Sequence, residues 1–321
     1  MPTLISVCIP VYNAASSIKA CVQSILAQSF QDFEIVLVND GSTDDSLIVC
    51  QQLAEEFPRI TLVSTANQGC TRARGTAVAH SSGTWVTFVD SDDTLPSTAL
   101  ADLFDGCSEK TDIVVGCQYE TDYPPYYIGI RRWREMLIHS DVIFCLPTAR
   151  LFRRDILSEE VFFLRTRVKA GTDMPMNVKI AFRTQKDVHL INKKVYQYYE
   201  HPDSLSHSAK WSIQKISDLY EEVVYSIPQG RENEFMSPLI QNRLIAMKNR
   251  YLQGAWRGES VRDNPYVIQL QKDIRETDYR LTVLQKMCVY HPDSLLTAVL
   301  FIGRHKAAVA IRVLSNLFRR K

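Results

Sequence analysis

The chain has 321 residues, a formal net charge of +1, and ordinary fractions of hydrophobic (45%) and charged (23%) residues. This length accommodates one large domain plus a second element, and this composition excludes an intrinsically disordered protein. The near-neutral charge balance gives no reason to expect a nucleic-acid partner.

The cysteines and the hydropathy pattern indicate a cytoplasmic protein. The eight cysteines are scattered without a Cys-x-x-Cys pair, so we expect reduced thiols rather than a disulfide framework or a zinc site. The first strand pattern begins at Leu4 and leaves no room for a signal peptide. The longest apolar stretch, from Leu295 to Ile302, is too short to cross a bilayer.

The first third of the chain alternates strand patterns with amphipathic helix patterns. The expected strands are Leu4–Ile9, Phe33–Val38, Ile60–Val63, Trp85–Val89 and Asp112–Val115. We expect the first strand to stop at Pro10, and helices to cover Ile18–Leu26 and Thr71–Ala79, with another beginning after Ser42 or Thr43 as its N-cap. Alternating units of this kind predict an α/β fold with a mostly parallel sheet flanked by helices.

The rest of the chain divides into two further parts after residues 1–116. Residues 117–206 are mixed in pattern and rich in aromatic side chains, and residues 207–321 form a mainly helical C-terminal extension. The last stretch, Arg304–Lys321, has no acidic residue and an apolar helical face. It is either a helix that lies on an anionic membrane surface or an ordinary packed helix with a solvated basic face.

An aspartate-rich segment, Asp90-Ser91-Asp92-Asp93, follows the fourth expected strand. Residues two apart on an extended segment point the same way, so Asp90 and Asp92 can converge on one site. Carboxylate oxygens suit Mn²⁺ or Mg²⁺, and such a cation could bridge the phosphates of a nucleotide diphosphate. The alternative is a solvated loop in which an aspartate caps a helix starting near Ser97.

A second polar segment, Asn39-Asp40-Gly41-Ser42, also stands at the carboxyl end of a strand. The Asp40 carboxylate can accept hydrogen bonds from a base or a ribose hydroxyl, and Gly41 permits close backbone approach. The alternative is a simple turn that caps the next helix. In parallel sheets, ligands bind beyond these strand ends.

Two further segments can reach the same edge. Pro10-Val11-Tyr12-Asn13 replaces the glycine-rich turn of a dinucleotide-binding fold, and Tyr12 either packs on a base or belongs to the core. Arg72 and Arg74 follow Gly69 near a helix start, where a guanidinium can reach a phosphate or a buried aspartate. A surface ion pair is the plain alternative for these arginines.

Taken together, these segments resemble the family 2 glycosyltransferases of the GT-A fold. The matching runs are Ile5–Asn13, Ser24–Phe30, Phe33–Asp44, Asn67–Gly69 with Ala73-Arg74, and Phe88–Asp93. The resemblance implies that residues 1–116 bind a nucleotide sugar, usually a UDP-sugar, and that residues 117–206 form the acceptor side. The implied donor-binding residues are Pro10, Val11, Tyr12, Asn13, Asp40, Gly41, Arg74, Asp90, Ser91 and Asp92, with Asp92 and Asp90 at the metal. Asn39 and Gly75 stand where Asp and Asn are more usual.

The second half resembles the family more thinly. Thr172-Asp173 resembles the family's Glu-Asp pair, whose aspartate is the general base, and Asp173 as the N-cap of a helix over Met174–Phe182 is the alternative. The same comparison suggests acceptor contacts, and we assign them to Arg150, Tyr198 and His201. Val195-Tyr-Gln-Tyr198 resembles the strand that closes this domain. A hydrogen-bonded surface histidine is the alternative at His201.

The resemblance implies an inverting enzyme that transfers one sugar to a saccharide or lipid-linked saccharide in bacterial surface polysaccharide synthesis, such as O-antigen, capsule or lipopolysaccharide. If the C-terminal helix binds lipid, the protein is peripheral on the inner face of the cytoplasmic membrane. Three alternatives stay open. An inactive binding module fits Thr172 in place of Glu. An aspartyl phosphotransferase would need Asp90-x-Asp92-x-Thr94 after its first strand, and a nucleotidyltransferase would need a glycine-rich loop where Pro10–Asn13 stands.

Overall fold

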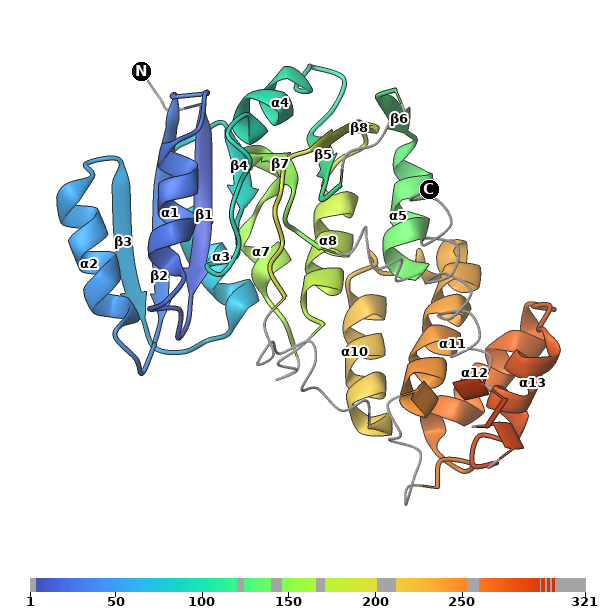
Figure 1. Cartoon of the computed structure of the whole chain (residues 1–321). Coiled ribbons are helices and arrows are strands. Elements are labelled where there is room, and N and C mark those ends of the chain that lie inside the picture. Colours follow the sequence, from blue (N-terminus) through green and yellow to red (C-terminus); the bar gives the residue numbers. More distant parts are fainter. Residues whose placement is uncertain are drawn as a thin grey trace, which may run out of the picture. The chain divides into compact units, whose positions relative to one another are not determined.

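A computed structural model describes residues 4–119, 124–139, 146–165, 171–200, 212–252 and 260–303, with 295, 298 and 301 excepted. The chain divides into two compact units (Figure 1). The first contains Met1–Leu137 and Asp141–Ser204, and the second contains Ile138–Ser140 and Leu205–Lys321. His201 and residues 304–321 lie outside the described residues, so the expectations for them stay untested.

The first unit is built on one eight-stranded sheet with the strand order β3-β2-β1-β4-β7-β5-β8-β6. The strands are β1 (Ile5–Val11), β2 (Phe33–Asp40), β3 (Ile60–Thr65), β4 (Trp85–Phe88), β5 (Ile113–Cys117), β6 (Tyr126–Ile128), β7 (Arg150–Arg153) and β8 (Val188–Lys194). Strands β1 to β4 run parallel, β7 is antiparallel to both β4 and β5, β5 and β8 are parallel, and β6 is antiparallel to β8. The predicted α/β fold is confirmed, and the first third of the chain supplies its four adjacent parallel strands.

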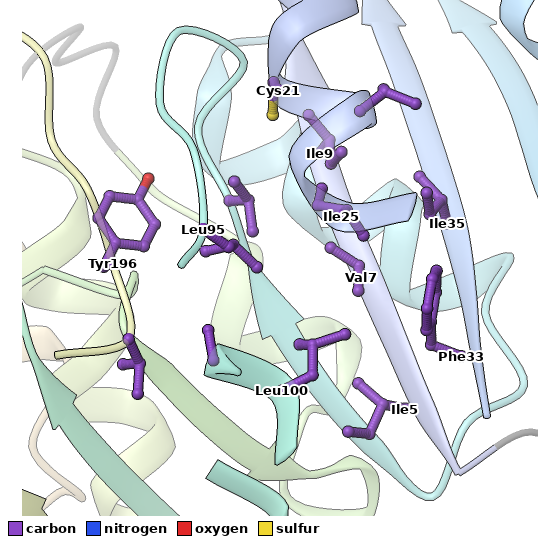
Figure 2. Close-up of a cluster of buried hydrophobic side chains, with 14 of the residues drawn as sticks. Ile5, Val7, Ile9, Cys21, Ile25, Phe33, Ile35, Leu95, Leu100 and Tyr196 are labelled. Atoms are coloured by element: carbon purple, nitrogen blue, oxygen red, sulfur yellow. The ribbon is translucent and has the colours of Figure 1, made fainter. Parts of the chain in front are cut away.

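Helices cover the sheet, so the central strands β1 and β2 are buried along nearly their whole length. They are α1 (Ile18–Leu26), α2 (Ser46–Glu56), α3 (Cys70–Ala79), α4 (Ala99–Asp105), α5 (Ile130–His139), α7 (Glu159–Phe162) and α8 (Asp173–Phe182), with a 3₁₀ turn η1 (Arg154–Ile156). Alternate residues of β1, such as Val7 and Ile9, pack with Ile25 of α1 and Leu100 of α4 (Figure 2). Phe88 of β4 instead contacts the ring of Phe162 in α7.

Two boundaries differ from the sequence prediction. Strand β1 continues through Pro10 to Val11, because β4 pairs with β1 only as far as Cys8 and no ladder hydrogen bond needs an N–H from Pro10 on that side. Helix α2 begins at Ser46 rather than just after Ser42 or Thr43. The Ser42 hydroxyl accepts a hydrogen bond from the Asn13 N–H, so it fixes the neighbouring loop instead of capping the helix.

Two close contacts brace the first unit, and the first of them lies at the amino ends of the parallel strands. Glu34 accepts hydrogen bonds from the Ser6 hydroxyl at 2.6 Å and from the Gly83 N–H at 3.2 Å, and also bonds Ser82. Partial burial tends to raise the pKa of the Glu34 carboxyl, but these hydrogen bonds outweigh it and hold the pKa below its ordinary value. On the α3 side, a Cβ added at Gly75 would lie 2.7 Å from the Phe162 Cβ, so helix α3 packs closely on α7.

The second unit is helical in its described part, as the sequence predicts. Its elements are α10 (Ile213–Tyr225), η2 (Glu232–Phe235), α11 (Met236–Leu252), α12 (Pro265–Glu276) and α13 (Val283–Tyr290). A buried Arg243 lies over the rings of Tyr220 and Tyr266 and pairs with Asp273, so this unit has a polar centre inside its apolar core. Among the described residues, no helix combines the length and the apolar character needed to cross a membrane.

Candidate active site

One buried arginine joins two carboxylates that are far apart in the chain. Arg74 of α3 is 1% exposed, and its two terminal nitrogens contact Asp90 Oδ1 and Asp173 Oδ1, each at 2.7 Å. Asp90 follows β4, whereas Asp173 opens helix α8. Burial alone would lower the pKa of the Arg74 guanidinium, but the surrounding negative groups raise it well above its ordinary value. The two carboxylates keep 38% and 31% exposure, so a ligand can reach both.

The aspartate-rich loop is held by a tyrosine from the segment that follows β8. The Tyr196 hydroxyl, which lies beside Leu95 in Figure 2, accepts from the Asp90 N–H at 3.1 Å and donates to Asp93 Oδ2 at 2.7 Å. The Tyr199 N–H donates to the other oxygen of Asp93. Burial raises the pKa of the Asp93 carboxyl to about 7, although both hydrogen bonds act against this. Asp93 is therefore a support of the loop.

No residue of this aspartate loop caps the following helix, because α4 begins at Ala99 with Thr98 as its N-cap. Asp92 is exposed and Ser91 is half-buried. Among the described residues, no group of three or more His, Cys, Asp or Glu side chains could hold a metal ion by itself. A pair of aspartates suits a Mg²⁺- or Mn²⁺-type cation that completes its shell with phosphate oxygens of a substrate, so the residues present fit such a metal only together with a bound diphosphate.

The predicted nucleotide-binding residue Asp40 fixes the turn that leads into α3. Its side chain is 3% exposed and accepts from the Gln68 and Gly69 N–H groups, both at 2.8 Å. Gly41 has a φ of +69°, and a Cβ at this position would lie 2.7 Å from the Asn67 nitrogen. The expected close backbone approach at Gly41 is therefore an approach to the α3 turn. By holding this turn, Asp40 fixes the start of helix α3, which carries Arg74.

The Pro10–Asn13 segment lies at the same edge of the sheet. Pro10 and Val11 are buried in β1, whereas Tyr12 is 48% exposed. Asn13 has a φ of +51°, and its side-chain oxygen accepts from the Thr43 N–H at 2.8 Å. Tyr12 is therefore not a core residue, and an exposed ring at this edge can pack against a base.

Helix α8 carries the predicted base. Its N-cap residue is Thr172, so Asp173 is the first helical residue rather than the cap, and its carboxylate faces Arg74. Farther along the helix, the Asn177 side chain accepts from Arg150 at 3.2 Å, and the Ala181 carbonyl accepts from Arg134. These contacts fix the helix along its length.

The proposed acceptor residues lie in different surroundings. Arg150 is 2% exposed and stacks over Trp133 at 5.1 Å, so it supports α8 from inside the fold. Tyr198 is 44% exposed and lies in the segment just after β8, where the sequence comparison suggested a strand. Next to it, the segment contacts the aspartate loop through the Gln197 and Thr94 backbones. Arg72, the second arginine of the α3 motif, is exposed and stacks over Phe163.

Comparison with known proteins shows what this chain is similar to. Residues 6–160 match the model of Glycosyl transferase family 2. Among curated relatives, the glycosyltransferase EpsJ of Bacillus subtilis is 30% identical over 64% of this chain and 64% of its own length. GlyA of Streptococcus pneumoniae is 30% identical over 70% of this chain but only 35% of its own length. The chain thus spans less than two thirds of these relatives.

Solved structures share the fold. The structure titled S. aureus TarS 1-349 in complex with UDP-GlcNAc has a TM-score of 0.57 and 17% identity, and covers 87% of this chain and 94% of that one. The mannosyltransferase PcManGT from Pyrobaculum calidifontis, in complex with GDP-Man and Mn²⁺, has a TM-score of 0.53 and 19% identity over 94% of this chain and 87% of that one. Residues 6–160 thus match glycosyl transferase family 2, and the chain is similar to curated glycosyltransferases of that kind.

Proposed function

We propose that this protein transfers one sugar from a UDP-sugar to a saccharide or lipid-linked saccharide acceptor in bacterial surface polysaccharide synthesis. The observation that carries the proposal is the placement of Asp90 and Asp173 on one guanidinium, that of Arg74, at the carboxyl edge of the parallel strands. A UDP-GlcNAc complex among the structural neighbours supports the donor. A relative named poly(ribitol-phosphate) beta-glucosyltransferase, 30% identical over 57% of this chain, supports a cell-surface polymer.

Asp173 is the proposed general base. Arg74 holds its Oδ1, which leaves Oδ2 to take the proton of the acceptor hydroxyl. The acceptor oxygen attacks the anomeric carbon as the bond from that carbon to the diphosphate breaks. In this single displacement, the configuration inverts. Because the base and the donor loop share Arg74, the acceptor hydroxyl and the donor can be held in one fixed geometry.

Asp92, with Asp90 beside it, is the proposed holder of Mn²⁺ or Mg²⁺. Such a cation would neutralise the charge that develops on the departing UDP. Asp90 Oδ1 already accepts a hydrogen bond from Arg74, so Asp90 would offer the cation its other oxygen, Oδ2. Asp40 and Gly41 shape the turn beside the nucleotide, and the exposed Tyr12 ring offers it a stacking surface.

The proposed location is the cytoplasm, with the basic stretch of residues 304–321 on the inner face of the membrane. Its six basic side chains and the absence of acidic ones support attraction to anionic lipid, worth about 1 kcal/mol per charge near the surface. Liposome binding should therefore rise with anionic lipid and fall with salt. Changing Arg312, Arg319 and Arg320 to Glu should abolish it. Wild-type protein that ignores anionic liposomes at low salt contradicts this part of the proposal.

The deciding experiment measures UDP release from several UDP-sugars with Mn²⁺, together with the Asp173→Asn variant. This variant should bind the donor normally but lose about 10²- to 10⁴-fold in turnover, because general-base help is removed. Asp155→Asn is the matched control, since the Asp155 side chain is 80% exposed and pairs with Arg153. Release of UDP by wild-type protein also excludes the inactive binding module. Nearly normal turnover of Asp173→Asn would assign the base role elsewhere.

A further inference from the structure

Two threonine hydroxyls meet beside the proposed base. The Thr71 hydroxyl of α3 donates to the Thr172 hydroxyl at 2.9 Å, although the two residues stand 101 positions apart. Both side chains are buried, with 3% and 9% exposure. Thr172 directly precedes Asp173, and Thr71 lies one helical turn before Arg74. The hydroxyl pair and the ion pair therefore connect the same two helices at neighbouring points.

Thr172 does not use its hydroxyl in the usual way for its position. As the N-cap of α8 it would ordinarily accept a hydrogen bond from a backbone N–H of the first turn, which stabilises a helix by about 1 kcal/mol. Its backbone is instead already helical, with φ −73° and ψ −14°, and the side chain makes no capping hydrogen bond within the described residues. Gly171, with a φ of +82°, supplies the sharp turn before it. The hydroxyl is thus turned away from its own helix and toward α3.

The first turn of α8 is held to α3 by two contacts, the Thr71–Thr172 hydrogen bond and the Arg74–Asp173 ion pair, and one contact alone would leave its orientation open. Thr71 and Arg74 are three residues apart, so they lie on the same face of α3. With the Arg74 contact alone, the Asp173 carboxylate could pivot about its Oδ1. The second contact, one residue earlier in the chain, fixes the backbone that carries Asp173 and so narrows the range of this pivot. It also adds no negative charge beside Asp90 and Asp173, where a carboxylate would repel a diphosphate.

We propose that the Thr71–Thr172 pair is a positioning device for Asp173, one that holds its carboxylate at the angle from which it meets the acceptor hydroxyl. The inference rests on the proposed role of Asp173 as base. The effect of the threonine pair should appear in turnover rather than in donor binding, because neither threonine is among the residues proposed on the donor side, Asp40, Arg74 and Asp90. A misplacement of about 1 Å at a reacting group can cost about 10²-fold in rate.

The test uses the double variant Thr71→Val/Thr172→Val. Replacing both partners of a buried hydrogen bond with apolar groups of the same shape is nearly neutral for stability, so the melting temperature should stay close to that of wild-type protein. We expect kcat to fall about tenfold while KM for the UDP-sugar and the Kd for UDP stay unchanged. The double Thr→Ser variant keeps both hydroxyls and should retain kcat. Thr76→Val is the control, because the Thr76 hydroxyl donates to the Arg72 carbonyl of its own helix and makes no other hydrogen bond within the described residues.

The outcomes separate the two proposals. If Asp173→Asn is slow but the double-valine variant turns over normally, the positioning role is wrong and the proposed base stands. If the double-valine variant loses melting temperature and donor affinity together with kcat, the pair is merely structural. If wild-type protein transfers no sugar from any UDP-sugar, the proposed function fails and the positioning inference fails with it.

Discussion

Replacing Arg74 with lysine tests how far the fold depends on one guanidinium that serves two carboxylates. Arg74 contacts Asp90 and Asp173 at 2.7 Å each, and a hydrogen bond to a charged group contributes about 1.5–3 kcal/mol. A lysine ammonium is a compact point charge without the planar fork, so it can serve only one of the two carboxylates. We expect Arg74→Lys to lower the free energy of unfolding by about 2 kcal/mol.

Arg74→Met removes both contacts and extends the series. Breaking a buried ion pair costs about 3–5 kcal/mol. Both carboxylates keep about a third of their exposure, so water can solvate part of the charge that is left behind. We therefore expect a loss of about 4 kcal/mol rather than the sum of two full penalties. The loss should be twice that of the lysine variant.

Urea unfolding followed by circular dichroism measures both values, because the midpoint moves at constant slope when only stability changes. Arg132→Lys is the control within the same unit. Its guanidinium is 69% exposed and contacts Glu135 at 3.3 Å, so the change should cost less than about 1 kcal/mol. An Arg74→Met variant that unfolds at the wild-type urea concentration would refute the account of Arg74 as a buried bridge.

Three other changes have definite expected results. Asp92→Ala should abolish Mn²⁺-dependent UDP release without lowering the melting temperature, and wild-type activity that survives exhaustive chelation with EDTA would contradict this. Glu34→Gln should lower the free energy of unfolding by about 1 kcal/mol at pH 7. The pKa of Glu34 in the folded protein lies below 4.5, so the difference in stability between variant and wild type should shrink as the pH falls through that lower pKa. A stability difference that does not change with pH would contradict this. Gly75→Ala should destabilise by about 1–3 kcal/mol through its clash with Phe162, and adding Phe162→Leu should recover part of the loss in thermal unfolding.

Local patterns were sufficient to predict the parallel half of the sheet. The carboxyl ends of parallel strands share one edge, so the sequence correctly predicted that the segments around Asp40 and Asp90 lie there. It also placed Arg74 where a guanidinium can reach an aspartate, although the observed partner Asp90 is partly exposed rather than buried. The start of α2 was wrong because hydrogen bonds from the Asn13 loop compete for the Ser42 side chain, and local propensity does not contain such long-range contacts.

The other half of the site could not be derived from spacing. Arg74 and Asp173 are 99 residues apart, and only the family resemblance singled out Asp173. The role of Tyr196 in holding the aspartate loop was missed. In sequence, a tyrosine inside an apolar strand pattern looks the same as a core residue, and only the structure shows that its hydroxyl donates to Asp93. The Thr71–Thr172 contact was missed for the same reason: nothing near either threonine in the sequence signals the other.

The spacing of the two partners of Arg74 has a consequence for the order in which the protein is made. Asp90 leaves the ribosome 16 residues after Arg74, whereas Asp173 follows only 99 residues after it. Strands β1 to β4 all end by Phe88, so this part of the sheet can assemble while the rest of the chain is still being synthesised. A nascent chain, or a fragment cut at residue 160, would hold Arg74 with a single partner. If Asp173 is the base proposed above, catalytic competence arrives only when helix α8 docks.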